Sequence, residues 1–142
     1  MPTNPASPRA RALEKHKVAY AIVDEPLLPP ETHITTSFAY FRWHGKGTNP
    51  WFDYCYTRQE LEPWIPKIKE ASEKVKTVYG YFNNHFHGYA VENCLQVARM
   101  LGTLAPQQAQ AQQKVENYFK TVAKHKDSKL EAFFKEEKPK DS

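Results

Sequence analysis

Three short apolar or aromatic segments of the chain each end in polar side chains. Asp24 and Glu25 follow the first segment, Arg42 and His44 close the second, and Asn83–Asn84 follows the third. A carboxylate can act as a general base or metal ligand, and an arginine can bind a carboxylate or phosphate through two hydrogen bonds. A histidine transfers protons near neutral pH. Brought together, these residue types would suit the binding and hydrolysis of an anionic ester.

Each of these residues also has a purely structural interpretation. Asp24 can cap a loop, Arg42 can pair internally with Asp24 or Glu25, and consecutive asparagines after a strand are ordinary turn residues. Taken singly, each residue is more often structural than catalytic. Their joint occurrence at three segment ends favours a functional role for Arg42, His44 and Asn83.

The loop residues give weaker signals. Trp51, Tyr54 and Tyr56 can form a stacking wall for a sugar or base, or can simply pack beneath a long loop. His85 and His87 form an H-x-H pair that lacks a third ligand at a defined spacing, so no metal site is predicted. The sequence contains no P-loop and no GxGxxG, GxSxG or HExxH motif, which leaves any cofactor unknown.

The three segments are predicted to be strands of a parallel sheet. Val18–Val23 is almost wholly apolar, Ser37–Arg42 is aromatic, and Thr77–Phe82 combines β-branched and aromatic residues. The carboxyl ends of parallel strands lie at one edge of a sheet, where α/β proteins place their sites. The polar residues are therefore expected to gather at that edge.

Helices are predicted around the strands. Pro8–His16 is expected to form a short helix, and Tyr89–Leu101 carries a longer apolar stripe. Thr57–Glu60 fits a capping box. Because prolines disrupt a regular helix, Pro63 and Pro66 predict a separate first turn or a kink before a main helix of about Pro63 to Lys76.

The composition divides the chain into three parts. Residues 1–6 are predicted to be disordered, residues 7–104 to form the α/β domain, and residues 105–142 to form a helical extension. This extension is first Ala/Gln-rich and then Lys/Glu-rich, with a break predicted near Asp127-Ser128. The three parts together predict an α/β unit with an appended helical tail.

Bulk properties describe an ordinary globular chain. It has 142 residues, of which 40% are hydrophobic, and a formal net charge of +4. The dispersed basic residues permit an anionic partner without predicting one. No run of 18 apolar residues predicts a membrane span, and two distant cysteines predict no disulfide framework. A cytoplasmic location is expected.

The same residues form an ordered pattern along the chain. The pattern runs Asp24-Glu25-Pro26, Tyr40-Phe41-Arg42-Trp43-His44-Gly45, Trp51 with Tyr54 and Tyr56, Glu60-Leu61-Glu62-Pro63-Trp64, Tyr81-Phe82-Asn83-Asn84, then Gly88, Ala90 and Asn93. It resembles the C-terminal part of the YecE-like proteins, known as domain of unknown function 72, from about Leu13 to Leu101. The resemblance implies a partial (β/α)8 TIM barrel of about three parallel strands, with Asp24, Arg42, His44, Asn83 and Asn84 facing the cleft.

A complete barrel of this kind needs at least about 200 residues, so the resemblance covers a fragment of one. Three parallel strands leave two open edges, which are prone to association. The chain could complete its barrel with a second chain, pair with itself, or cover its core with its C-terminal helices. The last possibility would use the apolar stripes that contain Phe119, Val122, Phe133 and Phe134.

The function predicted is that of an uncharacterised YecE-like protein with an anion- or phosphate-binding cleft, hydrolase- or phosphoesterase-like once completed by a partner. Asp24 and Glu25 would serve as base or metal ligand, with His44 as a further catalytic residue. Arg42, Asn83, Asn84 and Tyr54 are the residues predicted to bind the substrate. A phosphate or nucleic-acid ligand is an analogy from fold alone. The alternative is a non-catalytic binding or assembly module, so whether the chain is an enzyme stays open.

Overall fold

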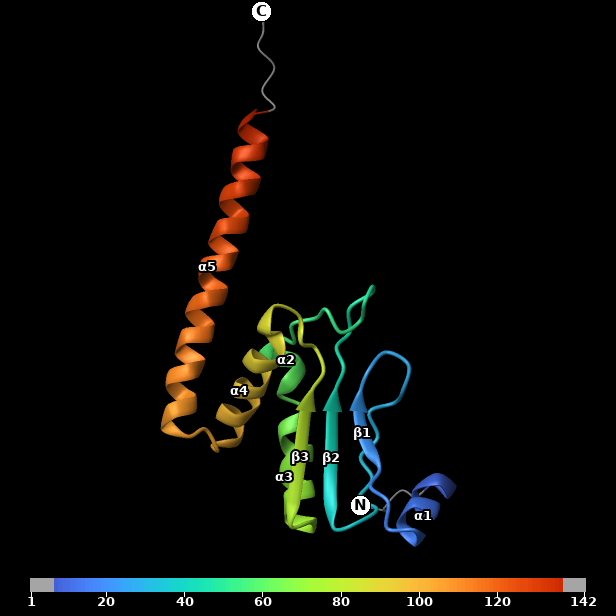
Figure 1. Cartoon of the computed structure of the whole chain (residues 1–142). Coiled ribbons are helices and arrows are strands. Elements are labelled where there is room, and N and C mark those ends of the chain that lie inside the picture. Colours follow the sequence, from blue (N-terminus) through green and yellow to red (C-terminus); the bar gives the residue numbers. More distant parts are fainter. Residues whose placement is uncertain (1–6, 137–142) are drawn as a thin grey trace, which may run out of the picture. The chain divides into compact units, whose positions relative to one another are not determined.

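The chain contains both helices and strands (Figure 1). The computed structural model describes the backbone of residues 7–136 and the side chains of residues 7–122. The elements are α1 (Pro8–Lys15), β1 (Ala21–Asp24), β2 (Phe38–Trp43), α2 (Arg58–Leu61), α3 (Trp64–Lys74), β3 (Thr77–Phe82), a 3-10 turn (Phe86–Gly88), α4 (Tyr89–Leu101) and α5 (Pro106–Glu136). The chain divides into two compact units, which meet in sequence between Leu104 and Ala105.

The first unit is built on a parallel sheet with the strand order β1-β2-β3 (Figure 1). This confirms the predicted α/β unit of three parallel strands. β1 is shorter than the predicted segment Val18–Val23, because the side chain of Thr35 replaces strand pairing at its start. The Thr35 hydroxyl donates to the carbonyl of Val18 over 2.6 Å and accepts the N–H of Tyr20 over 2.8 Å.

The two faces of this sheet differ. In β2, the buried residues Ala39, Phe41 and Trp43 alternate with residues that are more exposed. The buried set packs on α3 and α4, and the core continues through Ile68 and Val97. The opposite face, called the open face below, comprises Phe38, Tyr40, Arg42, Tyr79 and Tyr81.

Trp43 is the centre of the core on the helix side. Its ring stacks on Phe82 at 4.7 Å between centroids and meets Trp64 edge-on at 5.7 Å. Gly80 makes room for it, since a Cβ there would lie 3.2 Å from Cζ3 of Trp43. Offset and edge-on ring pairs are favourable, so this group fixes the end of β2 against α3 and β3.

The helices of the first unit follow their local signals. The predicted capping box is confirmed, with Thr57 and Glu60 bonding reciprocally at the start of α2. The predicted interruption is also confirmed, because α2 ends at Leu61 and α3 begins at Trp64. Pro66 lies in the first turn of α3, where the missing N–H of a proline has no helical partner to lose.

The second unit contains α5, which is continuous from Pro106 to Glu136. The predicted break near Asp127-Ser128 is therefore wrong. Neither residue type interrupts a helix strongly, and no glycine or proline occurs between residues 107 and 136. The predicted stripe residues Phe133 and Phe134 lie beyond the side chains that the structure describes, and the predicted disorder of residues 1–6 also lies outside it. Within the described backbone, no helix combines the length and apolarity needed to cross a membrane.

Candidate anion-binding site at the strand ends

The polar residues at the strand ends lie on two different sides of the sheet. Asp24 pairs with Trp43 in the strand register, and Trp43 faces the helices. Because side chains alternate along a strand, Arg42 projects from the open face. The backbone ladder continues past the strands, since the N–H of His44 donates to Asp24 over 3.0 Å and that of Asn83 donates to Trp43 over 2.7 Å.

Arg42, Asn83 and His44 meet on the open-face side and are called the strand-end cluster below. Arg42 Nη2 donates to Asn83 Oδ1 over 3.3 Å, and Asn83 Nδ2 lies 3.3 Å from His44 Nδ1. The amide oxygen accepts from Arg42, so the amide nitrogen is the atom that donates to His44. His44 Nδ1 is then the acceptor, which places the proton of the neutral imidazole on Nε2. Asn83 thus fixes both a guanidinium and an imidazole.

The charge balance of the strand-end cluster is positive. Burial and the nearby Arg42 charge lower the pKa of His44 below 6.5, while Glu25 acts in the opposite direction. His44 is therefore neutral at pH 7. Within the described part of the chain, no Asp or Glu side chain forms an ion pair with Arg42. The guanidinium keeps donors for an anion from solution, and the internal pair with Asp24 or Glu25 does not form.

Glu25 is the carboxylate whose charge acts on the strand-end cluster. Its charge acts on His44, and its backbone forms an isolated bridge with Leu28 that closes the turn after β1. The side chain is half-buried. Of the two predicted carboxylates, Glu25 is therefore the one that acts on the open-face side.

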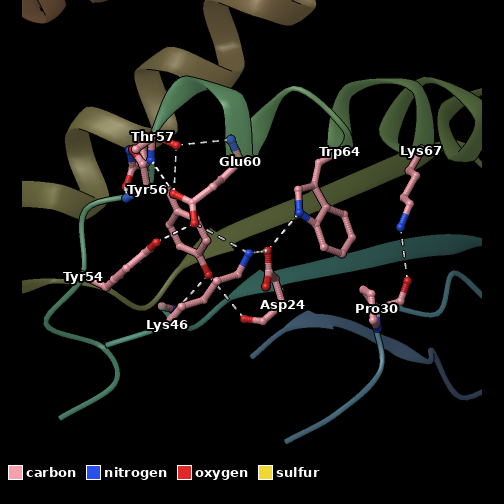
Figure 2. A network of polar contacts seen from close by, with 11 residues as sticks. Asp24, Pro30, Lys46, Tyr54, Tyr56, Thr57, Glu60, Trp64 and Lys67 are labelled. Carbon is pink, nitrogen blue, oxygen red and sulfur yellow. Dashed lines mark hydrogen bonds and ion pairs between the residues drawn. The ribbon is translucent and has the colours of Figure 1, made fainter. Parts of the chain in front are cut away.

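Asp24 belongs instead to a network on the helix side (Figure 2). Its side chain is 8% exposed. Asp24 Oδ2 accepts from Trp64 Nε1 over 2.9 Å and pairs with Lys46 Nζ at 3.4 Å. Lys46 also lies 3.9 Å from Glu60. The carboxylate of Asp24 is thus held by internal partners.

Tyr54 lies in the same network through Glu60 (Figure 2). Its hydroxyl donates to Glu60 Oε1 over 2.5 Å, and the N–H of Thr57 donates to Oε2 over 2.8 Å. Burial and this contact raise the pKa of Tyr54 to about 12. Burial opposes ionisation of Glu60, but the Tyr54 and Thr57 bonds and the Lys46 charge outweigh it and lower the pKa of Glu60 below its usual value. Tyr54 therefore stabilises the loop between β2 and α2 and is not part of the strand-end cluster.

Tyr56 ties the ends of β1 and β2 together. Its side chain is 1% exposed. The hydroxyl accepts the N–H of Gly45 over 2.8 Å and donates to the carbonyl of Asp24 over 3.4 Å. Gly45 has φ +98°, and a Cβ there would lie 2.4 Å from the carbonyl oxygen of Trp51. This turn directly follows His44, so Tyr56 and Gly45 set where the imidazole lies.

Two asparagines complete the brace of this loop. Asn93 accepts the N–H of Tyr56 over 3.0 Å and donates to its carbonyl over 2.9 Å. Asn84 is fully buried and donates to the carbonyl of Tyr54 over 2.7 Å and to Asn93 over 2.8 Å. The structure therefore places Asn84 beneath the loop, away from Asn83.

The chain matches one known protein family over most of its length. The sequence model of the family "Protein of unknown function DUF72" matches residues 3–118. The chain belongs to the DUF72 family. The family matched is the one that the ordered pattern of the sequence resembles.

The similar proteins are longer than this chain. The UPF0759 protein YunF of Bacillus subtilis (strain 168) is 31% identical over 47% of this chain, which spans 30% of that protein. A DUF72 family protein of Thermotoga maritima is 33% identical with a TM-score of 0.62, over 69% of this chain and 42% of that one. A DUF72 family protein of Enterococcus faecalis is 26% identical with a TM-score of 0.62, over 66% of this chain and 40% of that one. These neighbours are TIM-barrel-like.

Several residues of the site of this DUF72 chain were not among its predicted catalytic or binding residues, although Tyr56 was considered from the sequence as part of a stacking wall. Lys46, Tyr56 and Trp64 form or brace the helix-side network, and Asn93 holds the loop above it. Tyr56, Trp64 and Asn93 belong to the family pattern, which was a usable signal. Lys46 carried no such signal, because a lysine in a polar loop is usually solvated.

The paired histidines of this DUF72 chain lie elsewhere. His85 stacks on Phe52 with ring centroids 5.5 Å apart, and His87 Nε2 lies 4.0 Å from an oxygen of Asp53. Over the described residues, no three His, Cys, Asp or Glu side chains are grouped so that they could hold a metal ion. The strand-end cluster is therefore the candidate site of this chain.

Proposed function

We propose that this DUF72 chain binds a phosphate-type anion at the strand-end cluster. One observation carries the proposal: Arg42 has no acidic partner within the described residues, yet Asn83 links its guanidinium to the Nδ1 edge of the His44 imidazole. A half-buried guanidinium with free donors binds phosphate through charge-assisted bonds. The ligand would lie across Arg42 and His44, with Asn83 keeping both donors in place.

Hydrolysis of a phosphoester is the finer form of this proposal. Glu25, whose charge acts on His44, would take a proton from the attacking water while Arg42 stabilises the charge on the phosphoryl oxygens. The water oxygen forms the new P–O bond, the P–O bond to the ester oxygen breaks, and that oxygen leaves as an alcohol after taking up the proton that Glu25 removed from the water. Asp24 is the less suitable base, because Trp64 and Lys46 already occupy its carboxylate.

The test removes the guanidinium. In calorimetric titration with inorganic phosphate, Arg42→Ala should abolish binding, while its melting curve stays close to that of the wild type. Arg58→Ala is the matched control, because Arg58 pairs with Glu62 on the surface of α2 and should leave binding unchanged. Undiminished binding in Arg42→Ala would refute the site, and a collapse of its melting curve would show that Arg42 is structural.

A second candidate function is assembly, and the open face supports it. Phe38 and Tyr79 are 36% and 45% exposed there. Within the described residues, β1 and β3 each pair only with β2, so both edges of a parallel sheet lack a neighbouring strand. Since the barrel-like neighbours are more than twice as long as the part matched, we propose that a second chain supplies strands that close this face.

The proposal includes a reducing location. Cys55 and Cys94 are both free thiols. Free cysteines persist where glutathione and thioredoxin keep thiols reduced. A cytoplasmic protein fits this state.

A further inference from the structure

Two tyrosines lie beside Arg42 on the open face. Arg42 pairs with Tyr81 in the register of β2 and β3, so both side chains project from the same face on adjacent strands. Tyr81 is 52% exposed. The ring of Tyr40 supports it from the side, with centroids 5.5 Å apart and planes inclined by 34°. The strand-end cluster therefore adjoins a flat, accessible ring that is held in place.

This juxtaposition suits a ligand with two parts. Arg42 and Tyr81 come from neighbouring strands, whose backbones are about 4.8 Å apart, so a ligand that spans one strand spacing could meet both side chains. A ring bound over Tyr81 would gain stacking energy without any specific hydrogen bond. The charged part would meanwhile reach the guanidinium of Arg42. Neither part would have to displace the Asn83 contacts.

We propose that the anion bound by the strand-end cluster carries a flat ring that stacks on Tyr81, as in an aryl phosphate. This inference rests on the proposed anion site and narrows its ligand. The ring lies on the open face beside β3, and the phosphate lies on Arg42 and His44. A phosphate without a ring would then contact only Arg42 and His44.

The open face offers an internal control. Phe38 and Tyr79 form a second ring pair, 5.8 Å between centroids, located towards the amino ends of the strands. Tyr79 lies two residues before Tyr81, about 6.6 Å along the strand. A ligand anchored on Arg42 meets Tyr81 first. A substitution at Tyr79 therefore tests general apolar adsorption without touching the proposed ring subsite.

The experiment compares two phosphates of equal charge by calorimetric titration, phenyl phosphate with its ring and methyl phosphate without one. In the wild type, phenyl phosphate should bind about tenfold tighter than methyl phosphate, since stacking on one aromatic side chain contributes an effect of this order. Tyr81→Ser should reduce this preference to less than about twofold, whereas Tyr81→Phe and Tyr79→Ser should keep it. The binding of methyl phosphate should be the same in all four proteins.

The outcomes separate the two claims. Equal binding of both phosphates by the wild type overturns the ring subsite, and Arg42-dependent binding of methyl phosphate would then still support the anion site. A preference for phenyl phosphate that survives Tyr81→Ser also overturns the ring subsite. If neither phosphate binds, the anion site fails and the ring subsite fails with it.

Discussion

At the scale of single residues, the side of the sheet decides what each polar group can do. Arg42 and Asp24 end adjacent strands, but Arg42 keeps free donors on the open face, while Asp24 is held by Trp64 and Lys46. A buried carboxylate with a lysine and an indole partner is a structural group. A guanidinium without an acidic partner can bind an anion, which is the role that we propose for Arg42.

The lowered pKa of His44 gives a signed prediction for anion binding. His44 is neutral at pH 7, and its protonation adds a charge to the site. Sulfate does not titrate between pH 5 and 8, so its affinity should rise as the pH falls below about 6.5. A unit charge 4 Å away contributes about 1 kcal/mol even in water, so the rise should reach about fivefold.

Sulfate titrations from pH 8 to pH 5 measure this effect. His44→Gln should show a nearly flat profile, because glutamine keeps a donor but cannot gain the charge. The same rise in His44→Gln would assign the titrating group to another residue. An affinity that falls with decreasing pH would contradict the predicted sign.

The bond between Tyr54 and Glu60 predicts a pH-dependent stability. Glu60 has a lowered pKa in the folded state, so its contribution is complete above the unfolded value of 4.5 and is lost as the pH falls through the folded value. Tyr54→Phe should lower the free energy of unfolding at pH 7 by about 1 to 3 kcal/mol, as for a hydrogen bond to a charged group. It should also weaken the loss of stability below pH 4.5.

Urea unfolding at pH 7 and pH 3.5 tests both parts. Tyr79→Phe serves as the control, because Tyr79 is exposed on the open face, whereas Glu60 belongs to the network on the helix side. It should change neither value by more than about 0.5 kcal/mol. Equal losses for Tyr54→Phe at the two pH values would show that Glu60 remains ionised without its tyrosine.

The polar residues at the strand ends were predictable from the sequence, but the face of the sheet from which each side chain projects was not. The ends of the three strands correctly indicated Arg42, His44 and Asn83 as neighbours. The separation of Asp24 and Asn84 from them depends on a register that pairs Asp24 with Trp43. A shift of one residue would exchange the two faces, and no local sequence signal fixes the register to that accuracy.

At the scale of elements, the loop between β2 and α2 is the part that positions His44. Gly45 begins this loop with a positive φ and a close backbone approach to Trp51. The buried Tyr56 hydroxyl holds the N–H of Gly45. A substitution that distorts this loop should therefore lower the free energy of unfolding and displace the His44 imidazole at the same time.

Gly45→Ala is the substitution that tests this loop. Left-handed strain of about 1 to 2 kcal/mol and overpacking of about 1 to 3 kcal/mol should together destabilise the fold by roughly 2 to 5 kcal/mol. Gly88→Ala is the matched control, since Gly88 has φ +81° but a Cβ added there would meet nothing within 4 Å. Gly88→Ala should therefore be destabilised only by the left-handed strain. Equal losses in denaturant unfolding would contradict the close approach at Gly45.

Local signals predicted the elements that depend on local chemistry. The capping box at Thr57 and the prolines at 63 and 66 correctly predicted the division between α2 and α3. The late start of β1 was not predictable, because it depends on Thr35, which lies 17 residues from Val18. The continuity of α5 was not predicted, because Asp127 and Ser128 are weak helix formers that nevertheless do not end a helix.

At the scale of the whole molecule, a sheet with two unpaired edges and an aromatic open face should associate. Unpaired parallel strands offer backbone donors and acceptors to another chain. If a second copy supplies them, light scattering of the purified chain should show a mass above 16.5 kDa. A different partner chain would instead leave this chain monomeric until the two are mixed.

A charge on the open face should disrupt either form of association. Tyr79→Lys places an ammonium among the rings of this face, and light scattering should then show monomers only. Tyr118→Lys is the control, because Tyr118 is similarly exposed on α5 and should leave the mass unchanged. A wild-type chain that is monomeric and folded, and binds no second chain, would rule out the assembly function.

The most direct test of the anion site locates the bound ion by NMR. Nitrogen-15 spectra of the arginine and histidine side chains would be recorded during a sulfate titration of the full chain. We predict saturable shifts of the Arg42 Nε–H and His44 imidazole signals with one dissociation constant, while Arg58 stays unchanged. No saturable shift at Arg42, or equal shifts at Arg42 and Arg58, would contradict an anion site at the strand ends.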